Sequence, residues 1–377
     1  MSLEVELKLT LSPHHVESLK RQPLFRSEQI RELGSQQLGN TYYDTPEQLL
    51  TQHHVALRIR KKGEQLIQTL KSSGISEAGL HSRKEWEWLV QKPELNYELL
   101  KQAEWPKSLD CAAIEATIAP VFSTDFNRTT WILDTIDSKG EELKAEIALD
   151  QGKVLAHGLE DPICELEIEL LHGDASELVK FALELAKHVP LYISDISKAE
   201  RGYRLLEPSA YSIKRQIPEF NASTTLEQAF IELLKNELSL WPRYFEAWRF
   251  TNNWQYIPLA LESLRNIGAF YESFSDVIPP EPDGQLDKLL TKLIRQLRDI
   301  DAWRRTALLS GGLKTDSGNA WIDEQAKRAS ARAEVLLQTA EPGVLALLIS
   351  EQIIEKSWRR RWTEQHQALA SNCLLES

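Results

Sequence analysis

The residues most able to do chemistry are charged side chains at alternate positions of short segments. Near the start of the chain, Glu4, Glu6 and Lys8 are separated by single apolar residues. Similar spacing recurs in four further segments, whose charged residues are Arg58 and Arg60; Arg83, Glu85 and Glu87; Glu146 and Asp150; and Glu165, Glu167 and Glu169. Side chains two positions apart lie on the same face of a strand. Each segment therefore predicts a strand with one charged face.

A charged face is ordinarily the solvated side of an antiparallel strand, and this is the first alternative for any single segment. However, three glutamates at alternate positions, as in 165–169, place like charges on one face. That arrangement destabilises a strand unless cations or a metal lie among the carboxylates. Lys71, Arg128 and Lys198 add cations at or near strand positions. Five such strands together favour a charged interior over five solvated faces.

The presence of both acidic and basic residues limits the class of ligand that the site could bind. Clustered carboxylate oxygens are hard ligands that suit Mg²⁺ or Mn²⁺ better than zinc. Arginine and lysine beside them match phosphate oxygens, and the arginine fork can bind two oxygens at once. A site that holds both kinds in quantity predicts a ligand that is itself polyanionic and metal-bound. A triphosphate chain fits that description.

Two patterns of hydrophobic spacing divide the chain. Up to about Leu206 the dominant period is two, with turn residues between the segments, which predicts seven or eight antiparallel strands in a closed or nearly closed sheet. From Leu226 onward apolar residues recur at helical spacing, which predicts a helical bundle. We therefore expect an α+β protein with a β-barrel domain at 1–206, a linker at 207–221 and a helical domain at 222–377.

Bulk properties exclude several classes of protein. A length of 377 residues favours two domains, and 42% hydrophobic with 27% charged residues is an ordinary globular composition. The net charge of −12 argues against binding nucleic acid by general electrostatics. No apolar run reaches the ~18–20 residues of a membrane span. The three cysteines, with no CxxC pair, predict a reducing, cytoplasmic environment.

The string Glu4-Val5-Glu6-Leu7-Lys8 resembles the ExExK signature of the CYTH family, the triphosphate tunnel metalloenzymes. Further segments that resemble family motifs follow in the family's order: 42–45, 56–60, 68–71, 83–87, 146–150, 165–167 and 194–203. The resemblance covers roughly the first 205 residues. It implies an eight-stranded antiparallel tunnel with the catalytic residues lining its bore.

The resemblance also implies roles for individual residues. Glu4 and Glu6 would bind Mg²⁺ or Mn²⁺, and Asp150, Glu165 and Glu167 would complete the metal and water-positioning set. The residues that would hold phosphate groups are Lys8, Arg58, Arg60, Lys71, Arg83, Arg128 and Lys198. The candidate catalytic residues are Lys8, Glu85 and Asp150. Glu169 shares a strand face with Glu167 and is expected near the rim of the tunnel.

The second half resembles a degenerate CHAD domain, a helical partner of CYTH domains associated with polyphosphate. The stretch from Tyr256 to Arg265 corresponds to a family segment that usually carries histidine and arginine, but it has no histidine and one arginine. Polyphosphate is therefore the weaker candidate partner of this half. The four arginines here, Arg295, Arg298, Arg304 and Arg305, are expected to form a solvated helix face.

The leading functional prediction is metal-dependent hydrolysis of inorganic triphosphate to diphosphate and phosphate. A class IV adenylate cyclase and a thiamine triphosphatase are alternatives that would use the same tunnel. A protein that binds polyphosphate without catalysis is the alternative from another class. The predicted partner is a small triphosphate compound, with neither nucleic acid nor membrane.

Overall fold

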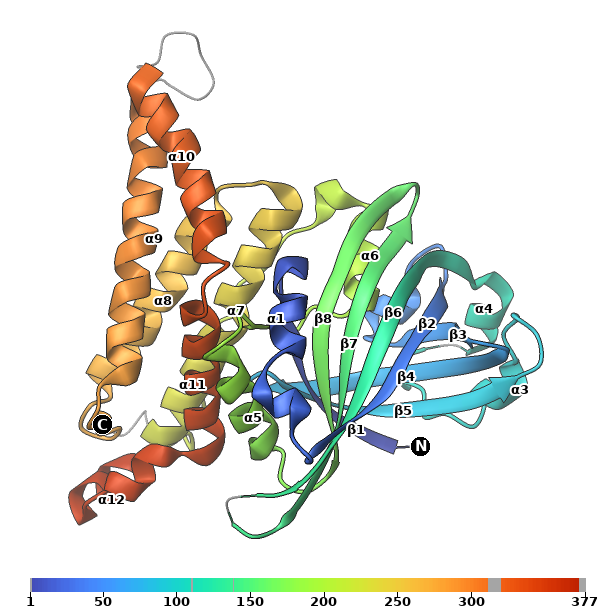
Figure 1. Cartoon of the computed structure of the whole chain (residues 1–377), viewed down its shortest axis with the longest axis horizontal. Coiled ribbons are helices and arrows are strands. Elements are labelled where there is room, and N and C mark those ends of the chain that lie inside the picture. Colours follow the sequence, from blue (N-terminus) through green and yellow to red (C-terminus); the bar gives the residue numbers. More distant parts are fainter. Residues whose placement is uncertain (1, 110, 138, 311–319, 373–377) are drawn as a thin grey trace. The chain divides into compact units, whose positions relative to one another are not determined.

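The chain folds into two compact units. The computed structural model describes residues 2–109, 111–137, 139–310 and 320–372. The first unit comprises residues up to 178 together with 195–211, and the second comprises 179–194 together with residues from 212 onward. Figure 1 shows the barrel of the first unit and the helices of the second. The chain therefore leaves the first unit and returns to it once before its final departure.

Eight antiparallel strands form the first unit. They lie in the order β5-β4-β3-β2-β6-β7-β8-β1, and pairing between β1 and β5 closes the barrel. Their bounds are β1 Ser2–Thr10, β2 Ile30–Asp44, β3 Ala56–Lys62, β4 Gln65–Glu77, β5 Leu80–Val90, β6 Ala119–Ile136, β7 Glu142–Ala156 and β8 Leu159–His172. The closed barrel followed by helices confirms the predicted α+β fold.

The strand register places opposite charges beside one another. Glu4 lies opposite Arg83 between β1 and β5, and Lys8 lies opposite Glu167 between β1 and β8. Lys71 lies opposite Glu85 between β4 and β5. Directly opposed side chains of an antiparallel pair are close enough to interact. The alternation seen in the sequence thus becomes a set of neighbouring ion pairs on the inner surface.

The apolar faces of β3, β4 and β5 point outward and form a core of their own. Leu57, Leu70 and Trp86 from these strands are buried in this core. Short helices beside them add further apolar residues, and their bounds are α2 Leu49–Gln52, α3 Tyr97–Leu100 and α4 Cys111–Thr117. Covering the apolar side with helices leaves the charged side to face the bore.

The second strand, β2, was not predicted from hydrophobic alternation. Its residues 31–37 are all exposed, so this half has no buried face to produce a period of two. The register with β3 starts only at Leu38, which lies opposite Lys62. Gly34, with φ of +103°, accompanies a bulge in the pairing with β6, a conformation that favours glycine. The first half of β2 therefore extends past the end of β3.

A helix of the returning segment packs against the barrel. Helix α6, Lys198–Leu206, begins at Ser197, whose side chain accepts a hydrogen bond from the Glu200 amide at 3.0 Å. It contacts β6, β7 and β8. Gly202 lies against the ring of Phe122, and a Cβ there would lie 2.2 Å from Phe122 Cε2. This close approach fixes the position of Lys198 at the start of the helix.

Helices dominate the second unit, as predicted. They are α7 Leu226–Thr251, α8 Tyr256–Ser273, α9 Gln285–Leu309, α10 Ala320–Leu336, α11 Glu341–Glu355 and α12 Glu364–Ala370. Thr225 caps α7 in a capping box with Gln228. Two further α-helices among the described residues are α1 Val16–Lys20 and α5 Ser176–Ala186, and β9 spans Tyr192–Ile193.

Residues 179–194 belong to the helical unit rather than to the barrel. The Tyr192 hydroxyl donates a hydrogen bond to the carbonyl of Thr339 at 3.0 Å. Gly343 of α11 meets the backbone of Leu191 so closely that a Cβ would lie 1.6 Å from the Leu191 carbonyl oxygen. Lys180 and Glu355 form an ion pair at 3.0 Å. These contacts tie the excursion of the chain to α11 and its surroundings.

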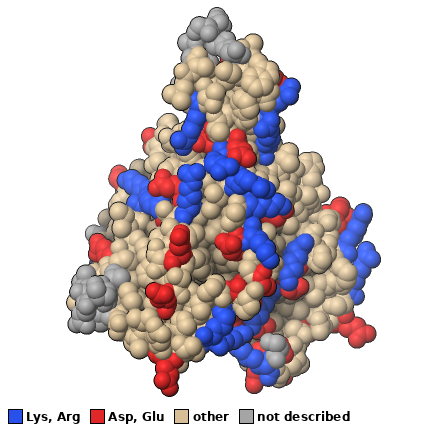
Figure 2. Space-filling view, turned by 90° about the vertical axis from the view of Figure 1, so that its left-hand side faces the viewer, with Lys and Arg blue, Asp and Glu red and all other residues tan. Residues whose placement is uncertain are grey.

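Basic side chains of the helical unit lie beside acidic ones. Arg298 pairs with Asp299 at 3.1 Å, and Arg305 pairs with Asp301 at 2.5 Å. On the face shown in Figure 2, basic and acidic side chains are interspersed. Among the described helices no single one could cross a membrane, and the bent pair α10–α11 meets the length and composition test only when its two helices are taken together.

Replacing Gly202 by alanine tests the contact between α6 and the barrel. The new methyl group would overlap the Phe122 ring, so we expect Gly202→Ala to lower the free energy of unfolding by about 1–3 kcal/mol. Urea denaturation measures this change. Gly39→Ala is the control, because a Cβ at Gly39 has no atom within 4 Å. Equal stability of the two variants would contradict the close packing.

Candidate active site

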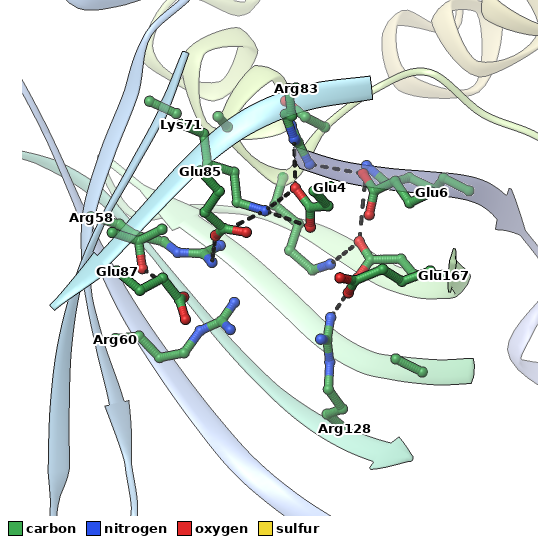
Figure 3. A pocket seen from close by; sticks show the side chains of 18 of the residues that line it. Glu4, Glu6, Arg58, Arg60, Lys71, Arg83, Glu85, Glu87, Arg128 and Glu167 are labelled. Atoms are coloured by element: carbon green, nitrogen blue, oxygen red, sulfur yellow. Dashed lines mark hydrogen bonds and ion pairs between the residues drawn. The ribbon is translucent and has the colours of Figure 1, made fainter. Parts of the chain in front are cut away.

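The bore of the barrel holds a cavity of about 310 Å³ with a highly charged lining. Seven acidic and seven basic side chains line it: Glu4, Glu6, Glu85, Glu87, Glu146, Glu167 and Glu169, with Lys8, Arg58, Arg60, Lys71, Arg83, Arg128 and Lys198. Tyr42, Thr69, Ser197 and three alanines complete the lining. Figure 3 shows the labelled side chains converging on this space from several strands. The predicted charged interior is therefore present.

Glu4 lies at the centre of one ion-pair network. Lys71 donates to both its carboxylate oxygens at 2.8 and 2.9 Å, and Arg83 Nε donates at 3.0 Å. Arg83 also reaches Glu6 at 2.8 Å. Although burial opposes the charged form, Lys71 and Arg83 lower the pKa of Glu4 to about 2. Glu4 is therefore a carboxylate at neutral pH.

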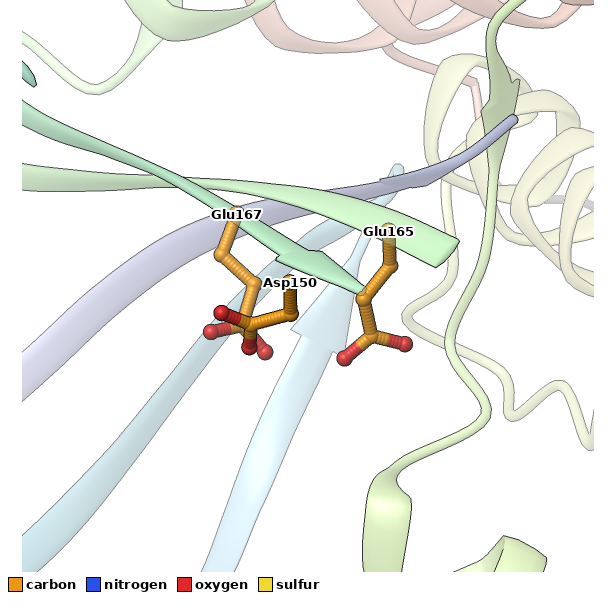
Figure 4. A group of neighbouring side chains, drawn as sticks. All are labelled: Asp150, Glu165 and Glu167. Atoms are coloured by element: carbon orange, nitrogen blue, oxygen red, sulfur yellow. The ribbon is translucent and has the colours of Figure 1, made fainter. Parts of the chain in front are cut away.

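Lys198 lies at the centre of a second network. Its ammonium contacts Asp150 at 2.7 Å, Glu167 at 2.9 Å and Glu165. The three carboxylates, drawn in Figure 4, have ligand atoms within 4.8 Å of one another and could hold a metal. In this structure the Lys198 ammonium contacts all three. Arg128 adds a bidentate pair to Asp150, with both contacts at 2.7 Å.

Asp150 and Glu165 have no exposed surface, and neither lines the cavity. From this position they hold Lys198, and Asp150 also holds Arg128, both of which do face the cavity. Burial opposes the charge on Glu167, but Lys198 and Arg128 keep its pKa well below the usual value. The buried carboxylates of Asp150 and Glu165 thus position cations that line the cavity.

Arg58, Arg60 and Tyr42 form a third group on β3 and β2. Arg58 lies 3.7 Å from Glu85 and 3.5 Å from the Tyr42 hydroxyl. Arg60 Nε donates to Asn40 Oδ1 at 2.9 Å, and no ion pair of Arg60 is found in the part of the chain that the structure describes. Burial and the nearby Arg58 and Arg128 lower the pKa of Arg60 to about 10. This group offers positive charge to a ligand.

Glu146 and Glu169 line the cavity, although the sequence predicted no binding or catalytic role for either and placed Glu169 near the rim of the tunnel. They lie opposite each other between β7 and β8, and Glu169 lies opposite Glu6 between β8 and β1. Within the described residues, neither forms an ion pair. Burial, together with Glu4 and Glu146, raises the pKa of Glu169 to about 7. The alternate spacing along 165–169 showed that Glu169 shares a strand face with Glu167. Only the strand register shows that Glu6 and Glu146 lie beside it.

The structure brings most predicted site residues together. Lys8 and Glu85, two of the predicted catalytic residues, line the cavity, as do all seven predicted phosphate-binding cations. Glu4, Glu6 and Glu167 of the predicted metal set line it too, whereas Asp150 and Glu165 lie behind its wall. The individual roles given to these residues stay predictions.

Barrel and cavity together define an antiparallel β-barrel protein whose bore is lined by charged side chains of both signs. Residues 2–203 match the family model described as the CYTH domain. The chain belongs to the CYTH domain family.

This chain is similar to a curated protein and to several solved structures. An inorganic triphosphatase from Haemophilus influenzae is 37% identical over 212 residues, which are 54% of this chain and 55% of that protein. The matched region thus spans about half the length of this curated relative. A Hippeastrum protein described as an adenylyl cyclase with a dominant triphosphatase activity is 19% identical, with a TM-score of 0.37 over 55% of this chain and all of its own.

A Bacillus halodurans protein described as an adenylate cyclase is 21% identical, with a TM-score of 0.31 over 50% of this chain and 90% of its own.

Replacing Glu169 by glutamine tests the crowded carboxylates. The pKa of Glu169 is near 4.5 in the unfolded chain and about 7 in the folded one. As the pH rises through this range, the carboxyl group therefore increasingly destabilises the folded state. We therefore expect Glu169→Gln, in EDTA, to melt at a higher temperature than the unaltered protein at about pH 8, with the difference shrinking toward about pH 5. Thermal melts across this range measure it.

Glu142→Gln is the control for this experiment, because Glu142 is an exposed residue at the start of β7. It should change the melting temperature little at either pH. A Glu169→Gln protein that melts below the unaltered protein at the higher pH would contradict the proposed repulsion.

Proposed function

We propose that this chain hydrolyses inorganic triphosphate to diphosphate and phosphate in the bore of its barrel, with a divalent metal. The observation that carries the proposal is the cavity lining, in which seven cations face the space beside seven carboxylates. Cations alone would suit a simple anion, and carboxylates alone would suit a metal. Both together suit a metal-bound polyphosphate. The similarity to the Haemophilus influenzae inorganic triphosphatase supports this choice.

The cavity favours inorganic triphosphate over a nucleotide or thiamine triphosphate. Among the described lining residues the only aromatic ring is Tyr42, which stacks on Phe122 at 4.7 Å. The apolar lining residues are the alanines Ala56, Ala148 and Ala199. An organic base or ring system is normally held by apolar and aromatic side chains. This lining provides little such surface, which argues against the cyclase and thiamine triphosphatase alternatives.

The carboxylates fit a divalent cation. Glu6 on β1, Glu169 on β8 and Glu146 on β7 lie in adjacent register positions. Glu4 lies on the same side of β1 as Glu6. Glu146 and Glu169 lack ion pairs among the described residues, and the raised pKa of Glu169 reflects its burial together with the nearby Glu4 and Glu146. With Glu4 they would hold Mg²⁺ or Mn²⁺, for which oxygen ligands are suited. A bound ion would supply positive charge to phosphate oxygens.

The cations of the bore bind and orient the substrate. Water attacks a terminal phosphorus, its oxygen forms a new P–O bond, the P–O bond to the bridging oxygen breaks, and diphosphate leaves with that oxygen. Arg58, Arg60 and Arg128 can donate several hydrogen bonds each to the oxygens on which charge builds up. Asp150 fixes Arg128 through two hydrogen bonds at 2.7 Å. These charges are in place before the reaction and need not reorganise.

Two parts of the proposal reach beyond the barrel. We place the protein in the cytoplasm, which its scattered cysteines favour. For the helical unit we propose no ligand, because its arginines 298 and 305 pair with neighbouring aspartates.

A substrate panel tests the activity. With Mg²⁺ or Mn²⁺, phosphate release from inorganic triphosphate should exceed release from ATP or thiamine triphosphate, and EDTA should abolish it. Glu6→Gln keeps a hydrogen-bond acceptor for Arg83 but removes the charge, so we expect turnover to fall by about 100-fold or more. Glu17→Gln, at an exposed residue of α1, is the control. Conversion of ATP to cyclic AMP as the fastest reaction would overturn the assignment.

A further inference from the structure

A second cavity adjoins the first. It has a volume of about 470 Å³, and three side chains, Arg60, Arg128 and Glu146, line both cavities. The other lining residues are Leu33, Gly34, Ser35, Gln36, Leu38, Lys62 and Thr130. Most of these belong to the first half of β2, where that strand extends past the end of β3. The proposed hydrolysis of triphosphate does not by itself account for this space.

Strand periodicity places Lys62 in line with the cations of the main cavity. On β3 the positions 58, 60 and 62 share one face, and successive positions on such a face are about 7 Å apart. Arg58 lines the main cavity, Arg60 lines both cavities, and Lys62 lines the second. Lys61 lies on the opposite face of the strand. The three cations therefore mark a path from one cavity to the other.

The second cavity has a surplus of positive charge. Arg60, Lys62 and Arg128 line it, against the single carboxylate of Glu146. Arg128 has partners in Asp150 and Glu167. The Arg60 guanidinium has a neutral partner in Asn40, at 2.9 Å. Ser35, Gln36 and Thr130 add polar side chains. This combination suits an anion that bonds several donors at once, as phosphate does.

We propose that the second cavity binds a phosphate group beyond the three of triphosphate, bound by Lys62 together with Arg60. The inference rests on the proposed function for the class of ligand and adds a further site for it. The same chemistry can come from two sources: the additional group of a linear polyphosphate longer than triphosphate, or orthophosphate released by the reaction. In either case Arg60 contacts ligand from both cavities.

The charge-removing variant Lys62→Gln tests the site. For tetrapolyphosphate we expect KM to rise about three- to ten-fold, the size of one partly exposed charge contact, while kcat/KM for tripolyphosphate stays within about two-fold. Lys61→Gln is the matched control, because it removes the same charge from the neighbouring residue on the other face. It should change neither value. Inhibition of tripolyphosphate hydrolysis by orthophosphate is measured on the same three proteins.

The two sources give different results. A raised KM for tetrapolyphosphate in Lys62→Gln identifies the additional group of a longer chain as the ligand. Weaker inhibition by orthophosphate, with tetrapolyphosphate kinetics unchanged, identifies the released product. If Lys62→Gln matches Lys61→Gln in both measurements, the proposal is wrong.

A binding measurement separates this proposal from the proposed activity. Calorimetry in EDTA needs no turnover, and the unaltered protein should bind tetrapolyphosphate more tightly than tripolyphosphate, or bind orthophosphate measurably. Lys62→Gln should remove that preference or that binding, and Lys61→Gln should keep it. A protein that hydrolyses nothing yet shows this pattern would refute only the activity. Equal binding by both variants would refute the site.

Discussion

The barrel depends on pairing opposite charges across its inner surface. Carboxylates and cations that face a narrow bore are costly to desolvate unless each has a partner. Register meets this need by placing Glu4 opposite Arg83, Lys71 opposite Glu85, and Lys8 opposite Glu167. A shift of one residue would turn these side chains to the outer surface and bring Trp86 inside. The same charges that prepare the site therefore also fix how the strands align.

Places where the pairing is incomplete support the proposed ligand. Glu146 and Glu169 face each other and form no ion pair among the described residues, and the Arg60 guanidinium has only a neutral hydrogen-bond partner there. The two glutamates thus lack a paired cation, and Arg60 lacks a paired anion. A metal ion bound to an anionic chain meets both needs at once. Asp150 and Glu165 differ from them, since Lys198 contacts both carboxylates and Arg128 also contacts Asp150.

Much of the barrel could be predicted from the sequence because its chemistry is periodic. Alternation identified the strands that carry Glu4, Arg58, Arg83 and Glu167, and these residues do meet in the bore. Strand β2 escaped prediction because residues 31–37 are exposed and show no alternation. Alternation also could not separate Asp150 from the cavity-lining residues. Asp150 is buried because Lys198 and Arg128 lie between it and the cavity. Lys62 continues the alternation of Arg58 and Arg60, but a second cavity beside it depends on how far β2 extends past β3, which alternation does not reveal.

The excursion of residues 179–194 has a consequence for how the chain reaches its final form during synthesis. Three chain crossings connect the units, after residues 178, 194 and 211. Barrel strands β1 to β8 are complete by His172, but the excursion packs against residues such as Thr339 and Gly343 that are made much later. Segments that pair over long sequence separations form slowly. Residues 179–194 therefore reach their final packing only after α11 has been made, well after the strands of the barrel.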